Sequence, residues 1–332
     1  MIPYSLLDLV PVVEGGSVRQ ALANAADMAR HAEANGYHRY WVAEHHGMDG
    51  IASSATAVVI AHVGAATSTI RIGAGGIMLP NHAPLMIAEQ FGTLDALFPG
   101  RIDLGLGRAP GSDQRVARAI RRALDTDPQA FPRDVLELQS YFADDGQTGI
   151  RATPGAGAKP ELWILGSSTF GAQLAAMLGL PYAFASHFAP DALDQALEIY
   201  RRDFRPSAQL DRPYAMAGFN VFAADTDEEA EFLASSQQQA FVALRTGNPR
   251  QLPPPVAGYR DSLPPPHAAI LDHVLQCSAV GSPATVERGI AAFVERTKVD
   301  ELMIVSSIYN VEARRKSVAI AAEVMRGVTV AA

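Results

Sequence analysis

The sequence holds a single cysteine, Cys277, so no disulfide can form within the chain and nothing points to an oxidising compartment. Positive charge is also scarce, because 27 basic residues stand against 35 acidic ones and the formal net charge is -8. Such a chain would repel nucleic acid. No window reaches the roughly 20 apolar residues that span a bilayer, and Asp8 interrupts the first apolar run, where a signal peptide would need its apolar core. We therefore expect a cytoplasmic protein without nucleic-acid or membrane partners.

What the chain does contain is a large apolar content, 48% of 332 residues, which is enough for one large core. Its first segment sets a pattern: residues 4–10 form an apolar run without helical period, and a helical stretch follows from Ser17 to Asn35. Ser17 has the side chain expected of a helix N-cap. The segment therefore predicts a strand, a loop and a helix.

The same alternation recurs along the chain. Further strands are predicted at residues 37–43, 70–77, 102–106, 162–165, 182–185, 214–223 and 302–306. Helices are predicted at residues 52–66, 84–98, 113–124, 134–142, 171–178, 191–204, 227–244 and 285–296. About eight continuous apolar strands separated by helices favour a parallel sheet closed into a (β/α)8 TIM barrel, with an open doubly wound sheet as the main alternative.

We interpret residues 1–332 as one domain, and the chain is longer than a simple barrel requires. A barrel of this kind takes about 250 residues, and the regular alternation loosens between residues 190 and 279, where we expect an insertion. Within it, residues 247–266 are rich in proline and leave almost no room for regular structure. We interpret this Pro-rich loop as a lid or binding loop at the C-terminal face. A disordered surface excursion is the alternative.

Barrel active sites lie at the C-terminal ends of the strands, so polar residues that follow each apolar run are the candidates. The candidates are Glu44-His45-His46, Gly75-Gly76 with Asn81-His82, Gly107-Arg108, and Gly166-Ser167-Ser168. The last segment precedes a helix and offers backbone N–H groups and hydroxyls to a phosphate, although a plain helix cap would use the same residues. Arg108 adds a planar, two-pronged partner for an anion.

Two other site types fit the residues less well. Gly105 to Gly111 imitates a dinucleotide fingerprint, with Asp125 or Asp127 as a ribose contact, but its last gap is too long and it contains a proline. His45 and His46 suggest a metal, but adjacent side chains in an extended segment point to opposite sides. No His-x-His or His-Glu-x-x-His spacing occurs in the sequence, and we expect no metal.

Three motifs in order and spacing resemble the bacterial luciferase-like monooxygenases. They are Trp41-Val42-Ala43-Glu44-His45-His46, the segment Ile72 to Pro80 around Gly75-Gly76, and the segment Gly100 to Arg108. The resemblance runs from residue 1 to about 190 and resumes more weakly at Val280 to Pro283. Residues 190–279 carry little of it.

The resemblance implies a barrel that binds reduced FMN and uses dioxygen to oxidise a small organic substrate. The reduced flavin would be either delivered by a separate NAD(P)H-dependent flavin reductase or regenerated from a nicotinamide, and the sequence shows no second nucleotide domain, which favours delivery. Relatives of this kind often form homodimers. His45 corresponds to the family's catalytic histidine, within a motif that includes Glu44 and His46. The residues it implies for flavin binding are Gly75, Gly76, Gly107, Arg108, Gly166, Ser167, Ser168 and Gly171. A cis peptide bond is expected between Gly75 and Gly76.

The sequence also departs from the luciferase pattern. Gly107 stands where luciferase has a reactive cysteine, and Ser167 and Gly171 replace an acidic residue and a threonine of its phosphate loop. These departures argue against light emission. Two further hypotheses use the same barrel, namely a deazaflavin-dependent hydride-transfer enzyme and a non-catalytic flavin-binding protein.

Overall fold

The computed structural model describes residues 2–108, 119–120, 130–144, 146 and 149–328. Its strands are β1 (Tyr4–Asp8), β2 (Arg39–Val42), β3 (Arg71–Met78), β4 (Ile102–Gly107), β5 (Glu161–Gly166), β6 (Tyr182–Phe184), β7 (Ala215–Ala223), β8 (Ser278–Gly281) and β9 (Glu301–Val305). All pair in parallel, and eight of them close a ring in the order β1, β2, β3, β4, β5, β6, β7, β9, with β9 beside β1. The predicted (β/α)8 barrel is confirmed.

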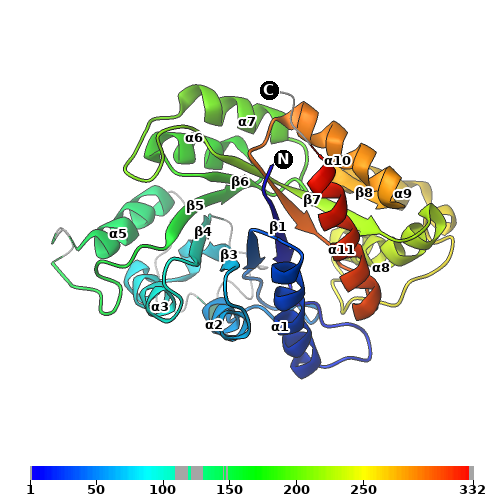
Figure 1. The fold of residues 1–332 in the computed structure, drawn as a ribbon, viewed down its shortest axis with the longest axis horizontal. Helices are drawn as coiled ribbons and strands as arrows, with labels where there is room; N and C mark the ends of the chain where they lie inside the picture. Colours follow the sequence, from blue (N-terminus) through cyan, green and yellow to red (C-terminus); the bar gives the residue numbers. More distant parts are fainter. Residues whose placement is uncertain (1, 109–118, 121–129, 145, 147–148, 329–332) are drawn as a thin grey trace.

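Helices surround the ring of strands (Figure 1). They are α1 (Val18–Ala34), α2 (Thr56–Ala66), α3 (Pro84–Leu97), α5 (Phe131–Ala143), α6 (Thr169–Leu178), α7 (Leu193–Asp203), α8 (Asp227–Arg245), α9 (Pro265–Val274), α10 (Pro283–Thr297) and α11 (Val311–Gly327). Short 3-10 turns η1 (Leu79–Asn81), η3 (Arg260–Ser262) and η4 (Leu275–Cys277) join some of them. Ser17 caps α1 as expected, since its hydroxyl accepts the Gln20 N–H at 3.2 Å.

Alternate residues of each strand belong to different cores. Leu6 lies in the large core between strands and helices, whereas Leu7 lies in a smaller cluster with Trp41, Trp163, Met216 and Met303. That smaller cluster fills the interior of the barrel. Trp41 and Trp163 meet there edge to face, with ring centroids 5.2 Å apart.

The amino-terminal end of the barrel interior, which we call the floor, is occupied by charged side chains. Arg39 donates to Asp103 at 2.9 Å and to Glu301 at 3.1 Å, and all three side chains are buried. The second oxygen of Asp103 accepts the indole N–H of Trp41 at 2.8 Å. Because Asp103 and Glu301 each accept from several protein donors, these buried charges compensate one another.

Three elements differ from the sequence-based prediction. β8 was not predicted, and it pairs with the last four residues of β7 outside the closed ring. α11 follows the last strand, where no helix was predicted. α9 begins inside the second proline cluster, so the expectation of almost no regular structure up to Pro266 was wrong at this end, because proline is well tolerated in the first turn of a helix. The helix expected over 113–124 lies largely outside the described residues.

Part of the Pro-rich loop is fixed against the C-terminal face. The Leu252 N–H donates to the Val12 carbonyl at 3.0 Å, and the Leu252 carbonyl accepts the Glu14 N–H at 2.9 Å. The loop after β2 also packs against the Pro-rich loop, because a Cβ atom on Gly50 would lie only 2.6 Å from the Arg250 carbonyl oxygen. The Pro-rich loop therefore contacts the loops that follow β1 and β2.

Candidate functional site

Glu44, two residues beyond β2, is the best-connected acidic group at the barrel mouth. It is 1% exposed, and its carboxylate contacts His46 at 2.7 Å, His82 at 2.9 Å and the Asn81 amide at 3.1 Å. The same carboxylate accepts the Met78 N–H at 2.9 Å. Burial alone would raise the pKa of Glu44, but His82 and the other donors bring it below its ordinary value. Glu44 is therefore an anion that fixes its neighbours.

The peptide bond between Gly75 and Gly76 is cis, as predicted. It interrupts the register between β3 and β4, and the Gly76 carbonyl accepts the Glu44 N–H at 3.1 Å. A Cβ on Gly75 would lie 2.7 Å from the Trp41 ring, and one on Gly76 would lie 2.6 Å from the Gly105 carbonyl oxygen. Both glycines are thus required by close packing within the barrel itself.

The two adjacent histidines have different surroundings. His46 is bound to Glu44, whereas His45 lies near a third histidine, His187, in the turn that follows β6. The imidazole of His187 has a pKa lowered to about 4, first by burial and then by His45. His45 and His187 therefore lie near each other at this end of the barrel.

Arg108 lies at the end of β4, beside the start of α6. Its guanidinium stacks over the Phe170 ring, 4.1 Å from the centroid. Among the described residues Arg108 has no ion pair with a carboxylate, and the donors to Glu44 do not include it. An alternative role for Arg108 is to brace the barrel rim through an ion pair with a nearby carboxylate such as Glu44 or Asp113. The pair with Glu44 is not observed, and Asp113 lies outside the described residues.

Ser167 and Ser168 are exposed at the amino end of α6. Ser168 occupies the N-cap position, but its side chain makes no capping hydrogen bond, so the simple helix-cap interpretation does not apply. Gly166 and Gly171 face each other across this turn, since a Cβ on Gly171 would lie 3.4 Å from the Gly166 Cα. A Cβ at this distance would make an ordinary van der Waals contact, so the strand end and the helix start lie side by side without requiring glycine at both positions.

Gly107 packs against the neighbouring strand. A Cβ at this position would lie 2.9 Å from the sulfur of Met78 on β3. A side chain here would require the flexible Met78 side chain to move. Gly107 nevertheless lies directly before Arg108, at the same end of the barrel as the other candidate residues.

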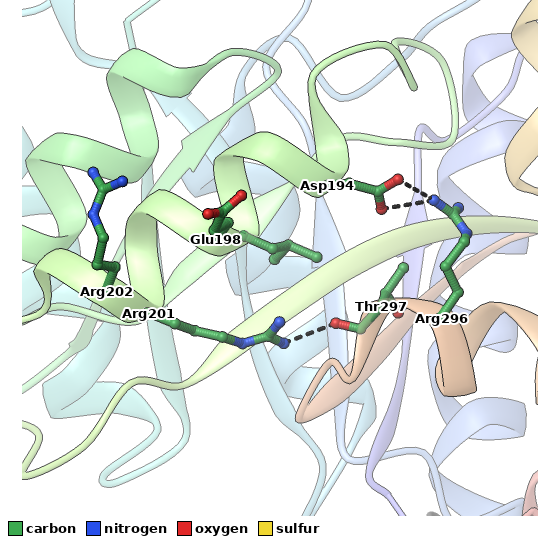
Figure 2. Close-up of a pocket in the computed structure, with 7 residues that line it drawn as sticks. Asp194, Glu198, Arg201, Arg202, Arg296 and Thr297 are labelled. Atoms are coloured by element: carbon green, nitrogen blue, oxygen red, sulfur yellow. Dashed lines mark hydrogen bonds and ion pairs between the residues drawn. The ribbon is translucent and has the colours of Figure 1, made fainter.

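Two hollows lie away from this end. One of about 520 Å3 lies between α7 and α10, where Asp194 faces Arg296 and Arg201 reaches the Thr297 carbonyl (Figure 2). Arg202 pairs with Asp203, so the arginines here are already occupied and offer little to an anion. The other, of about 470 Å3, lies near Tyr4 and Tyr37 at the amino-terminal side of the barrel.

Within the described ranges, no group of three or more His, Cys, Asp or Glu side chains could hold a metal ion. None of the described helices is long and apolar enough to cross a membrane. Taken together, the described candidates meet at one end of the barrel, on the ends of β2, β3, β4, β5 and β6.

Sequence reasoning missed two residues of this end. His82 was noted as a polar residue after β3 but was not assigned to the site, and its contact with Glu44 depends on how η1 turns. His187 was not noted, although it is the first titratable residue after the predicted sixth strand. Applying the strand-end rule to every strand would have found it.

Comparison with known proteins agrees with this geometry. The family model for luciferase-like monooxygenases matches residues 8–301, including residues 190–279, where the sequence alone showed little resemblance. A protein of Escherichia coli strain K12 described as "Luciferase-like monooxygenase" is 53% identical over 324 residues, covering 97% of each chain. N-acetyl-S-alkylcysteine monooxygenase of Bacillus subtilis strain 168 is 37% identical over 254 residues, covering 74% of this chain and 75% of the other.

Solved structures share the fold. Apo-MsnO8 superposes with a TM-score of 0.91 at 33% identity, covering 99% of both chains. The FMN complex of a 3,6-diketocamphane monooxygenase component from Pseudomonas putida gives 0.74 at 18% identity, covering 100% of each chain. An F420-dependent secondary alcohol dehydrogenase gives 0.71 at 15% identity, covering 99% of each chain. The last two similarities concern the fold alone.

Proposed function

Because the chain belongs to the luciferase-like monooxygenase family, we propose that it uses reduced FMN and dioxygen to oxidise a small organic substrate. The observation that carries the proposal is the meeting of two groups at one barrel mouth. Arg108 and the start of α6 form a corner suited to an anion, and Glu44 with His45, His46 and His82 forms a rim suited to proton transfer. Neither group alone would indicate a flavin.

The donors at the anion corner fit the phosphate of FMN. Arg108 supplies a planar guanidinium without a described acidic partner, Ser167 and Ser168 supply exposed hydroxyls, and α6 supplies N–H groups of its first turn. A phosphate dianion favours charge-assisted, bidentate contacts of this kind and the positive end of a helix dipole. Riboflavin would lose these contacts and keep those to the flavin ring.

When bound, reduced FMN supplies the electrons that activate dioxygen. The part played by the chain is to place the ligand and manage protons. His45, whose imidazole lies at the mouth, would exchange a proton with the bound ligand through a ring nitrogen. Glu44 would keep His46 and His82 oriented, because its carboxylate is anchored by backbone and side-chain donors on β3 and η1.

Three further assignments belong to this proposal. The reduced flavin would come from a separate NAD(P)H-dependent reductase, because the described fold is one barrel without a second nucleotide-binding sheet among its strands. The Pro-rich loop would cover the mouth, since Leu252 is anchored beside the loop after β1. The active form would be a cytoplasmic homodimer.

The test is a coupled assay. The protein is incubated with an FMN reductase, NADH, catalase and 18O2, and candidate substrates are screened by mass spectrometry, beginning with N-acetyl-S-alkylcysteines because a 37% identical relative carries that name. We expect one 18O atom in a product that forms only with both protein and reductase. Product formation with reduced deazaflavin but not with FMN would instead support the hydride-transfer hypothesis.

A further inference from the structure

His187 lies in the turn that follows β6, at the mouth of the barrel. Asn220 holds its backbone, because the Asn220 amide donates to the His187 carbonyl at 2.7 Å. The ring occupies the space that a side chain at position 218 would fill: a Cβ on Gly218 would lie 2.2 Å from the His187 Nδ1. Gly218 lies two residues beyond Met216, which points into the barrel, so its missing side chain also faces inward.

The Nδ1 atom of His187 has no hydrogen-bond partner and is buried, although the residue as a whole keeps partial exposure. Burial and the nearby His45 lower the pKa of the imidazole to about 4, so the ring is neutral at physiological pH. A neutral imidazole carries one N–H and one lone pair. The question is which nitrogen holds the proton.

The packing around Nδ1 indicates which nitrogen of His187 carries the proton. A buried N–H without an acceptor is rarer in proteins than an acceptor without a full set of donors, so the proton belongs on Nε2 and the lone pair on Nδ1. The atoms of His187 nearest to the Gly218 position are Nδ1, Cγ and Cε1. The Nε2 edge is thus turned away from Gly218, with its N–H available to a partner in the mouth.

The strand order shows from which sides of the barrel His187 and His45 reach the mouth. In the ring of eight strands β6 is four places from β2, so His187 and the segment carrying His45 come from opposite walls. An eight-stranded barrel is wide enough for side chains or one small ligand. A ring system lying across this mouth, with its phosphate at the β4 and β5 ends, would meet both histidines.

We propose that His187 is a flavin-contacting residue, a neutral imidazole that donates its Nε2–H to an acceptor atom of the flavin ring from the wall opposite His45. This inference rests on the proposed binding of FMN in the mouth. It assigns a contact with the ring to the turn after β6, whereas Arg108, directly after β4, and Ser168, directly before α6, would contact the phosphate. The two contacts can be separated with riboflavin.

The first measurement needs no ligand. In uniformly 15N-labelled protein, long-range 1H–15N correlation spectra from pH 5 to 8 report the tautomer of each histidine, and His187→Gln identifies the signals of His187. We expect a neutral Nε2–H form throughout this range. A protonated ring at pH 6, or a predominant Nδ1–H form, would overturn the assignment.

The second measurement is titration of wild type and variants with oxidised FMN and with riboflavin. One neutral hydrogen bond corresponds to about a 3- to 10-fold change in affinity. His187→Phe should weaken both ligands by this factor. His187→Gln, whose amide nitrogen reaches the place of Nε2, should recover most of the affinity, whereas His187→Asn, whose amide matches Nδ1, should not.

A purely structural histidine gives a different result. It predicts that His187→Phe lowers the melting temperature while both affinities stay within 2-fold of wild type (on the order of 0.4 kcal/mol), and that result would overturn the inference. Gly218→Ala checks it independently, because the added methyl group must displace the imidazole and should reproduce the affinity loss of His187→Phe. If wild type bound neither flavin, the proposed function itself would fail, an outcome distinct from equal binding by wild type and His187→Phe.

Discussion

The two ends of the barrel interior satisfy their polar groups in opposite ways. At the floor, Arg39, Asp103 and Glu301 are fully buried and compensate one another at 2.9 to 3.1 Å. At the mouth, His187 keeps a buried nitrogen without a partner, and the described contacts of Arg108 include no carboxylate. Unpaired polar groups cost stability. The other described buried side-chain atoms without a hydrogen-bond partner belong to Ser236 on α8 and Arg315 on α11, so among the described residues of the barrel interior this cost falls at the mouth.

The largest expected effect concerns the mouth. His45→Ala should slow oxygenation by about 10² to 10⁴, the usual contribution of a positioned acid or base, while the unfolding midpoint in urea and the FMN affinity stay near wild type. His62→Ala, a change at an exposed histidine on α2, is the control and should keep full activity. Normal turnover of His45→Ala, or loss of the fold, would contradict a catalytic role for His45.

The floor should respond in the reverse way. Asp103→Ala leaves Arg39, Arg71 and the Trp41 indole without their shared acceptor, so we expect a loss of about 3 to 5 kcal/mol in the free energy of unfolding. Asp194→Ala, which breaks the exposed pair with Arg296, should cost under about 1 kcal/mol. Urea unfolding measures both, and equal losses would show that burial at the floor has no special role.

A smaller effect is expected at the anion corner. Contacts to a charged group contribute about 1.5 to 3 kcal/mol, so Arg108→Ala should weaken FMN binding roughly 10- to 150-fold and leave riboflavin almost unaffected. Parallel fluorescence titrations measure this. Equal losses for both ligands would mean that Arg108 supports the rim rather than a phosphate.

The smallest expected effect is on how the free energy of unfolding depends on pH. Because the pKa of His187 is lowered to about 4, the unfolded chain binds a proton that the folded chain does not between about pH 6.5 and 4. Above that window the imidazole is neutral in both states and makes no pH-dependent contribution, whereas proton uptake by the unfolded chain lowers the free energy of unfolding as the pH falls through the window. His187→Phe should therefore lose about 1 to 3 kcal/mol less than wild type over this range, as measured by urea unfolding at each pH. Parallel pH curves would contradict the lowered pKa.

The sequence was most informative where a pattern repeats or a motif is local. The alternation of apolar runs predicted the barrel, and the motif around Gly75-Gly76 predicted the cis bond. Contacts between distant strands were less accessible. The binding of His82 by Glu44 depends on the geometry of η1, and the orientation of His187 depends on a glycine 31 positions later, at 218. β8 is only four residues long and follows a 3-10 turn, so it gave little periodic signal.

The attachment of Leu252 to the loop after β1 has a consequence for how the chain folds. Its two hydrogen bonds join Leu252 to Val12 and Glu14, which lie about 240 residues earlier in the sequence. The entropy of closing so long a loop must be overcome before those bonds contribute, and contacts of this range slow folding. We therefore expect the Leu252 and Glu14 amides to become protected from hydrogen exchange late during refolding, after the strands between them have assembled.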